Sequence, residues 1–148
     1  MGRHQREAQS LALLLVDVDC FKALNDASGH LYGDECLRTL ARLCSDSARN
    51  EDDLIARYGG EELALLLPCC ERDEAGQVAE HLRRRVKAEA MLHPASPVAS
   101  HVTVSIGVSA VRPGEASLPE TLIRGADRAL YAAKAQGRDC VVVRGISE

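Results

Sequence analysis

Several features that mark common classes of protein are missing from this chain of 148 residues. It contains no tryptophan, and aromatic residues make up only 3% of it, which argues against a surface that stacks the bases of single-stranded nucleic acid. With 18 basic and 22 acidic residues, the chain also lacks the excess positive charge that binds a polyanion. Nucleic acid is therefore not an expected partner.

Zinc, redox and membrane signals are also missing. None of the six cysteines forms a Cys-x-x-Cys pair, and the five histidines show no His-x-x-x-His spacing, so no zinc site is predicted. Several of the cysteines fall on apolar stripes, and we interpret these as small core residues of a protein in a reducing compartment. The apolar run at 11–16 is too short to span a bilayer and has no cleavage pattern behind it. These features predict a cytoplasmic protein without a membrane segment.

The residues that are present indicate one globular α+β domain. Hydrophobic residues make up 46% and charged residues 27% of the chain, as in ordinary globular proteins. The patterns predict strands at 11–18, 54–58, 62–67, 101–110 and 140–143, and helices at 19–24, 33–48, 74–90 and 119–135. The strand at 101–110 alternates and should have one polar face. The order βααββαβαβ contains the split β-α-β-β-α-β pattern of a ferredoxin-like fold, a mostly antiparallel sheet with helices packed against it.

Two acidic clusters lie at the ends of predicted strands. Asp17 and Asp19 end an apolar strand two residues apart, so their side chains leave it on the same side. Glu61 and Glu62 follow Gly59-Gly60, a pair that predicts a two-residue hairpin turn. If the first strand lies beside the hairpin, these carboxylates converge and offer the oxygen ligands of a Mg²⁺ or Mn²⁺ site. Exposed turn residues, with Asp19 as a helix cap, explain the spacing equally well.

Two further polar groups have a simpler interpretation from spacing alone. Asn25, His30 and Asp34 occur in a turn-rich stretch, where turn formation and helix capping explain them. Lys134 and Arg138 stand four residues apart at the end of the last predicted helix, where cations suit the helix dipole. Spacing by itself therefore favours structural roles for both groups.

Several ordered blocks resemble the GGDEF family of diguanylate cyclases. The resemblance extends over about residues 11–143, in the blocks Asp17-Val18-Asp19-Cys20-Phe21-Lys22-Ala23-Leu24-Asn25-Asp26, Gly29-His30, Gly33-Asp34, Arg57-Tyr58-Gly59-Gly60-Glu61-Glu62-Leu63, 102–108 and 126–138. It implies a nucleotide-cyclase-type fold and a bacterial signalling enzyme. The implied reaction is the condensation of two GTP molecules into cyclic di-GMP with release of pyrophosphate.

The resemblance also implies roles for the acidic residues. Asp17, the Val18 carbonyl and Glu61 are expected to hold the Mg²⁺ or Mn²⁺ ions. Such ions neutralise the triphosphate and stabilise the attacking and leaving oxygens. Glu62 is expected either to assist a metal or to help deprotonate the 3′-hydroxyl, and both roles stay open.

The other residues implied by the resemblance bind the nucleotide. Asn25 and Asp34 resemble the guanine-reading residues of the family, and a carboxylate that accepts from the N–H groups of guanine rejects adenine. Gly59 and Gly60 allow the hairpin backbone to approach the nucleotide closely. The remaining expected substrate-binding residues are Lys22, His30, Lys134 and Arg138.

One site of this kind holds a single GTP and performs half of the chemistry. Two subunits must therefore face each other across a two-fold axis. We expect an active homodimer that an upstream sensory domain or a partner protein controls. The alternative interpretation is a catalytically inactive GTP-binding or regulatory module of the same fold.

The sequence departs from the family pattern in three places. Leu63 stands where the family usually has Phe, which we interpret as a core substitution. The family's inhibitory Arg-x-x-Asp motif keeps its acid as Asp53 but has Asn50 in place of its arginine, so no feedback inhibition through it is expected. Residues 1–10 lack the family's usual opening segment. We therefore predict an N-terminal extension at 1–10 and a GGDEF domain at 11–148.

Overall fold

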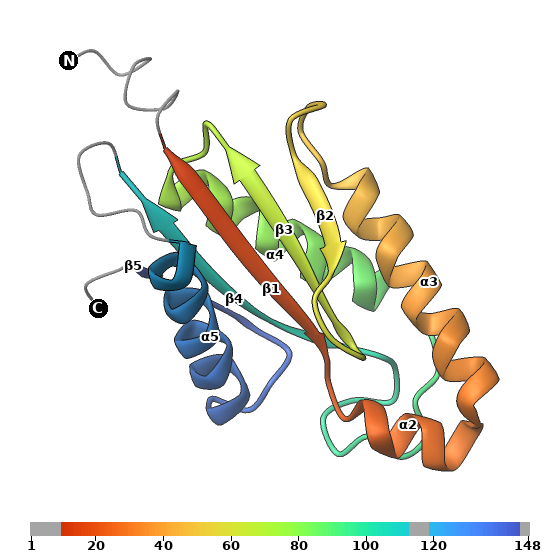
Figure 1. Cartoon of the computed structure of the whole chain (residues 1–148). Helices are drawn as coiled ribbons and strands as arrows, with labels where there is room; N and C mark the ends of the chain where they lie inside the picture. Colours follow the sequence, from red (N-terminus) through yellow and green to blue (C-terminus); the bar gives the residue numbers. More distant parts are fainter. Residues whose placement is uncertain (1–9, 113–118, 146–148) are drawn as a thin grey trace.

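A five-stranded sheet in the order β2-β3-β1-β4-β5 forms the centre of the molecule (Figure 1). The strands are β1 (Leu11–Val18), β2 (Leu54–Arg57), β3 (Glu62–Pro68), β4 (Val104–Val111) and β5 (Val141–Gly145). All neighbours pair antiparallel except β4 and β5, which are parallel. The computed structural model describes residues 10–112 and 119–145, so nearly all of the predicted N-terminal extension lies outside the described residues.

Helices cover both faces of the sheet. The helices α3 (His30–Asp46) and α4 (Arg72–Ala88) lie on one face and α5 (Pro119–Ala135) on the other, while α2 (Phe21–Ser28) lies beyond the end of β1 (Figure 1). Because side chains alternate along a strand, Leu13 and Leu15 of β1 pack with the apolar residues of α5, whereas Leu14 and Val16 join the larger core with α3 and α4. Leu63 is part of this larger core, as predicted. The predicted element order and the mostly antiparallel sheet are confirmed.

The helix α5 lies unusually close to β4. A Cβ atom at Gly107 would overlap the backbone of Ala126 and Leu130, so glycine permits this approach. Together with the larger core on the other face, this approach buries all eight residues of β4, including the serines of its polar face. The prediction of a strand is confirmed, but its polar face is turned toward α5 rather than toward water.

The segment after β1 differs from the prediction. Asp19 does not cap the next helix, because its carboxylate accepts hydrogen bonds from Thr103 and Ser105 instead. The residue directly before α2 is Cys20, which has a φ of 56° and makes no side-chain cap. The helix α2 continues to Ser28 instead of ending near residue 24. Gly29, with φ 92°, then separates α2 from α3, which begins at His30 and not at residue 33.

The connection between β2 and β3 is longer than predicted. Residues 58–61 lie between the two strands, and the N–H groups of Tyr58 and Gly59 donate to the Glu62 carbonyl at 2.9 and 3.3 Å. Neither Gly59 nor Gly60 has a positive φ. The two-residue turn was therefore a wrong prediction, although the hairpin itself is present.

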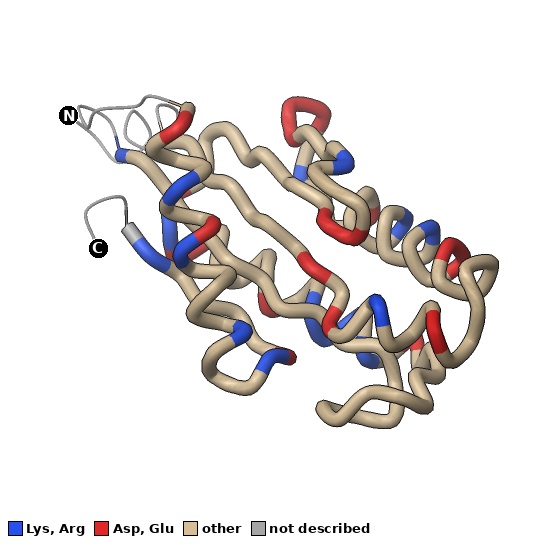
Figure 2. Tube along the Cα trace, turned by 60° about the horizontal axis from the view of Figure 1, so that its bottom comes forward, with Lys and Arg blue, Asp and Glu red and all other residues tan. Residues whose placement is uncertain are grey.

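Charged residues are interspersed along the helices, whereas the central strands are mostly uncharged (Figure 2). The acidic positions that interrupt the strands belong to the ends of β1 and β3, with Asp17 in one and Glu62 in the other. None of the helices in the described part of the chain is long and apolar enough to cross a membrane.

Candidate active site

The register of the sheet brings the two predicted acidic clusters together. Asp17 near the end of β1 lies directly opposite Glu62, the first residue of β3. Directly opposed residues of an antiparallel pair have Cβ atoms only about 4.5–5.5 Å apart. The Val18 N–H donates to the carbonyl of Glu61 at 3.4 Å, which ties the loop to the same strand end. Three carboxyl groups from distant parts of the sequence thus share one end of the sheet.

The electrostatics of this cluster leave it short of positive charge. Asp17 is buried and forms an ion pair with Lys134 of α5, but its Oδ1 has no hydrogen-bond partner among the residues that the structure describes. Burial raises the pKa of the Asp17 carboxyl; Lys134 opposes this effect and the charge of Glu61 adds to it. Burial and the charge of Asp17 likewise raise the pKa of Glu62. Lys134 therefore offsets only part of the repulsion among these acids.

A cleft of about 430 Å³ lies between α3 and the β2–β3 hairpin. Four of the predicted site residues, Asp34, Gly60, Glu61 and Glu62, line it. Its wall also includes Arg57 and several apolar residues of α3 and β2. The cleft therefore joins one of the predicted guanine-reading residues to the acidic cluster.

The hairpin loop is held in place by Arg57. Its guanidinium donates to the Gly60 carbonyl at 2.7 Å and to the Gly59 carbonyl at 3.4 Å. A Cβ atom at Gly60 would meet nothing within 4 Å, and one at Gly59 would make only ordinary contacts with Glu62. Neither packing nor backbone conformation requires glycine here, so the space beside the loop is open to a ligand. This role of Arg57 was not predicted from the sequence, although its place directly before the turn could have indicated it.

The amide of Asn25 lies against α3 at Gly33. A Cβ atom at Gly33 would overlap the Oδ1 of Asn25, so glycine makes room for this side chain. Within the described residues this Oδ1 is buried and has no hydrogen-bond partner. An unpaired buried acceptor is unfavourable, so an N–H donor from a ligand would stabilise the site.

Three of the predicted residues are not drawn into this arrangement. Lys22, His30 and Arg138 have exposed side chains, and none of them is among the residues that line the cleft. The structure brings together the acids, the hairpin, Asp34 and Lys134. The roles assigned to all of the site residues stay predictions.

The donor set suits a hard cation only in part. In the described part of the chain, no group of three or more His, Cys, Asp or Glu side chains is arranged to hold a metal ion. However, Mg²⁺ is commonly held by one or two carboxylates together with substrate phosphates. The unpartnered Oδ1 of Asp17, close to Glu61, fits that kind of site.

Asp53, the acid that remains of the family's inhibitory motif, forms an ion pair within the protein. Arg49 donates to both carboxylate oxygens of Asp53, at 2.7 and 3.0 Å, and the Asp53 side chain is 1% exposed. Burial alone would raise the pKa of Asp53, but the hydrogen bonds from Arg49 hold it below its ordinary value. This ion pair therefore supports the fold at the start of β2.

Residues 1–140 match the family described as "Diguanylate cyclase, GGDEF domain". The chain belongs to the GGDEF family. It is 41% identical over 132 residues to the response regulator PleD of Caulobacter vibrioides, and the aligned residues cover 89% of this chain and 29% of PleD. It is 43% identical over 140 residues to the diguanylate cyclase DgcM of Escherichia coli, covering 95% of this chain and 32% of DgcM. The chain thus spans about a third of the length of these relatives.

Solved GGDEF structures share the fold. The active GGEEF domain of a diguanylate cyclase from Vibrio cholerae aligns with a TM-score of 0.78 and 33% identity, over 95% of this chain and 86% of that domain. The diguanylate cyclase SiaD of Pseudomonas aeruginosa, solved with its activator SiaC, aligns with a TM-score of 0.79 and 41% identity, over 96% of this chain and 53% of SiaD. The predicted α+β, nucleotide-cyclase-type fold is confirmed.

Proposed function

We propose that this GGDEF domain is a diguanylate cyclase that condenses two GTP molecules into cyclic di-GMP and releases two pyrophosphates. The observation that carries the proposal is the meeting of Asp17, Glu61 and Glu62 beside the cleft between α3 and the hairpin. Relatives of 39–43% identity that are named diguanylate cyclases or probable diguanylate cyclases support the choice of reaction.

Asp17 and Glu61, with the Val18 carbonyl, would hold Mg²⁺ or Mn²⁺. When bound, such an ion neutralises charge on the triphosphate and on the attacking and leaving oxygens at the α-phosphorus. The protein contributes hard oxygen ligands at a fixed strand end. The raised pKa of Glu62 favours a role as the base that accepts the proton of the 3′-hydroxyl, because a base works best when its pKa is nearer the operating pH.

The guanine base would be read by one residue of α2 and one of α3. The Oδ1 of Asn25 and the carboxylate of Asp34 would accept hydrogen bonds from guanine, while the open space at Gly59 and Gly60 would admit the ribose and phosphates. Adenine would leave a carboxylate acceptor without a donor, which disfavours it. The residues proposed to contact the phosphates are Lys22, His30, Lys134 and Arg138.

Activity can be tested by incubating the protein with GTP and Mg²⁺ and separating the products by chromatography. We expect cyclic di-GMP and pyrophosphate from the wild type, and a loss of at least about 100-fold for Asp17→Asn or Glu61→Gln. Glu51→Gln, a change of an exposed acid, is the matched control and should keep full activity. Binding of GTP without product would favour the inactive regulatory alternative, and absence of both would refute the proposal.

The proposed enzyme acts as a two-fold dimer, because each subunit binds one GTP and each product bond joins the two nucleotides. A mixture of Asp17→Asn and Glu61→Gln subunits should stay inactive, since each subunit of a mixed dimer still carries one defective site. Recovery of turnover in the mixture would contradict the two-fold arrangement.

A further inference from the structure

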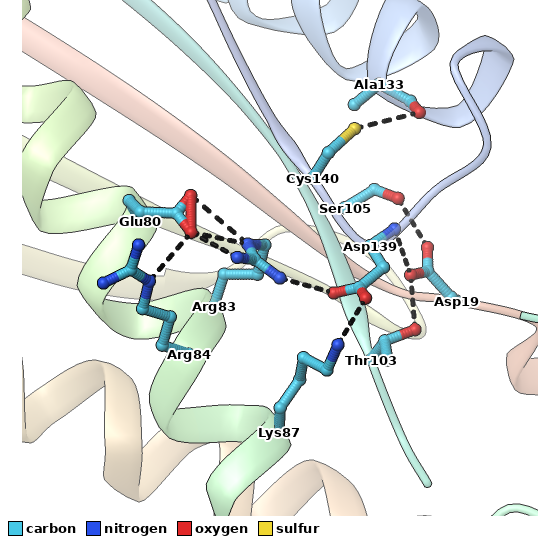
Figure 3. Close-up of polar contacts among 10 residues, drawn as sticks. All are labelled: Asp19, Glu80, Arg83, Arg84, Lys87, Thr103, Ser105, Ala133, Asp139 and Cys140. Carbon is cyan, nitrogen blue, oxygen red and sulfur yellow. Dashed lines mark hydrogen bonds and ion pairs between the residues drawn. The ribbon is translucent and has the colours of Figure 1, made fainter. Parts of the chain in front are cut away.

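Asp19 is a buried carboxylate that the proposed reaction does not use. It is 2% exposed, and both of its oxygens accept hydrogen bonds (Figure 3). The hydroxyls of Thr103 and Ser105 donate at 2.7 and 2.5 Å, and the backbone N–H of Asp139 donates at 3.0 Å. These three donors give both oxygens of the buried carboxylate hydrogen-bond partners. Asp19 therefore needs no metal ion to account for its burial.

The residue that Asp19 contacts in the C-terminal region belongs to a left-handed turn between α5 and β5. Arg138 and Asp139 have φ values of 65° and 48°, which residues other than glycine rarely adopt. Asp19 holds the turn through the Asp139 N–H. From the opposite direction, Arg83 and Lys87 of α4 donate to the Asp139 carboxylate at 2.8 and 2.9 Å (Figure 3). The unusual backbone conformation is thus fixed from two directions.

The direction of the Arg138 side chain depends on this turn. The side chain is exposed, and none of the other described residues holds its guanidinium by a hydrogen bond or an ion pair. Lys134, one helical turn earlier, is held instead by its ion pair with Asp17. Asp17, in β1, thus contacts its cation directly, whereas Asp19, just after β1, contacts only the backbone of the turn that carries Arg138.

We propose that Asp19 is a positioning residue, which holds the turn at 138–139 and thereby directs Arg138 toward the phosphates of the nucleotide. That Arg138 binds the nucleotide phosphates rests on the proposed function, whereas the role of Asp19 in holding the turn rests on the geometry alone. Arg83 and Lys87 extend the same support to α4, so that helix is linked to the nucleotide site through Asp139.

The test compares Asp19→Ala with the wild type in two measurements. Amide hydrogen exchange of residues 137–140 is measured without nucleotide, and affinity is measured for a non-hydrolysable GTP analogue and for guanosine. We expect exchange at the turn to be at least tenfold faster, affinity for the analogue to fall about tenfold, and affinity for guanosine to stay unchanged. A merely structural role would weaken both ligands alike, and that result would overturn the proposal, as would unchanged exchange.

Four further substitutions sharpen the test. Asp19→Asn keeps an acceptor for the Asp139 N–H and should restore most of the protection, while the exposed acid variant Asp52→Asn should change nothing. In an Arg138→Ala background, Asp19→Ala should cause no further loss of analogue affinity, so additive losses would count against the proposal. If Asp19→Ala does not fold, Asp139→Ala removes the ion pairs to α4 and should also speed exchange. A wild type that binds neither ligand would refute the proposed function, and exchange would still decide whether Asp19 holds the turn.

Discussion

The contact between Gly33 and Asn25 leads to an unusual prediction, that a substitution which strengthens a helix weakens nucleotide binding. Alanine is favoured over glycine inside a helix by about 0.8–1 kcal/mol. In α3, however, the new Cβ of Gly33→Ala would overlap the Asn25 Oδ1 and lie 3.0 Å from its Cγ and 3.3 Å from the Phe21 Cζ. The Asn25 side chain must therefore leave its position.

The expected magnitude follows from what Asn25 loses. One hydrogen bond from a guanine N–H to the Asn25 Oδ1 contributes about 0.5–1.5 kcal/mol, so affinity should fall by up to about tenfold. The fold should not suffer, because the displaced carbonyl exchanges an unpaired buried position for water. Together with the helix propensity, we expect the free energy of unfolding to stay constant or rise by up to about 1 kcal/mol, a shift of roughly 2–4 °C in Tm.

The assay combines calorimetric titration of a non-hydrolysable GTP analogue with thermal unfolding. Gly76→Ala in α4 is the matched control, since its Cβ would meet only a methyl group of Val143 at 3.2 Å, and it should leave affinity unchanged. Gly33→Ala combined with Asn25→Ala should bind no more weakly than Asn25→Ala alone. Wild-type affinity in Gly33→Ala, or additive losses in the double variant, would refute the reasoning.

Two other predictions concern stability. Glu62→Gln removes the charge opposite Asp17 and should stabilise the protein by about 0.2–1 kcal/mol at neutral pH without metal. Because the pKa of Glu62 is raised, the wild type regains this stability as the pH falls through that pKa, so the difference in Tm between variant and wild type should vanish in acid. The control Glu51→Gln should show no such pH dependence. Asp53→Ala leaves Arg49 without its buried partner and should lower the free energy of unfolding in urea by about 3 kcal/mol. If cyclic di-GMP strongly inhibited the wild type but not this variant, the ion pair would not be purely structural.

Local patterns predicted the regular elements well. The strand at 11–18 and the helix at 119–135 agree with the observed bounds, because an apolar run that stops at acids and a proline at a helix start are local signals. The left-handed turn at Cys20 has no such signal. Asp19 matched a helix cap by sequence, yet its partner Thr103 lies 84 positions away, so only the tertiary fold could decide between the two roles.

The candidate site depended in a similar way on strand pairing. Two acidic pairs were visible in the sequence, but their meeting required β1 to lie beside β3, which fixes Asp17 opposite Glu62. The sequence pattern of Gly59-Gly60 indicated a turn, whereas its length depends on the hydrogen bonds to the Glu62 carbonyl. Local sequence patterns therefore could not predict the register between distant strands or the tertiary partners of the side chains.

The ion pair between Lys134 and Asp17 has a thermodynamic consequence for the order of ligand binding. A divalent cation that reaches Asp17 in the proposed reaction competes with an ammonium group already seated there. Once displaced, the Lys134 ammonium would be free to pair with the phosphates of an incoming nucleotide. If both bind as proposed, metal and nucleotide would therefore increase each other's affinity by the same factor, since coupling between two ligands is reciprocal. Neither alone should then saturate the site as readily as both together.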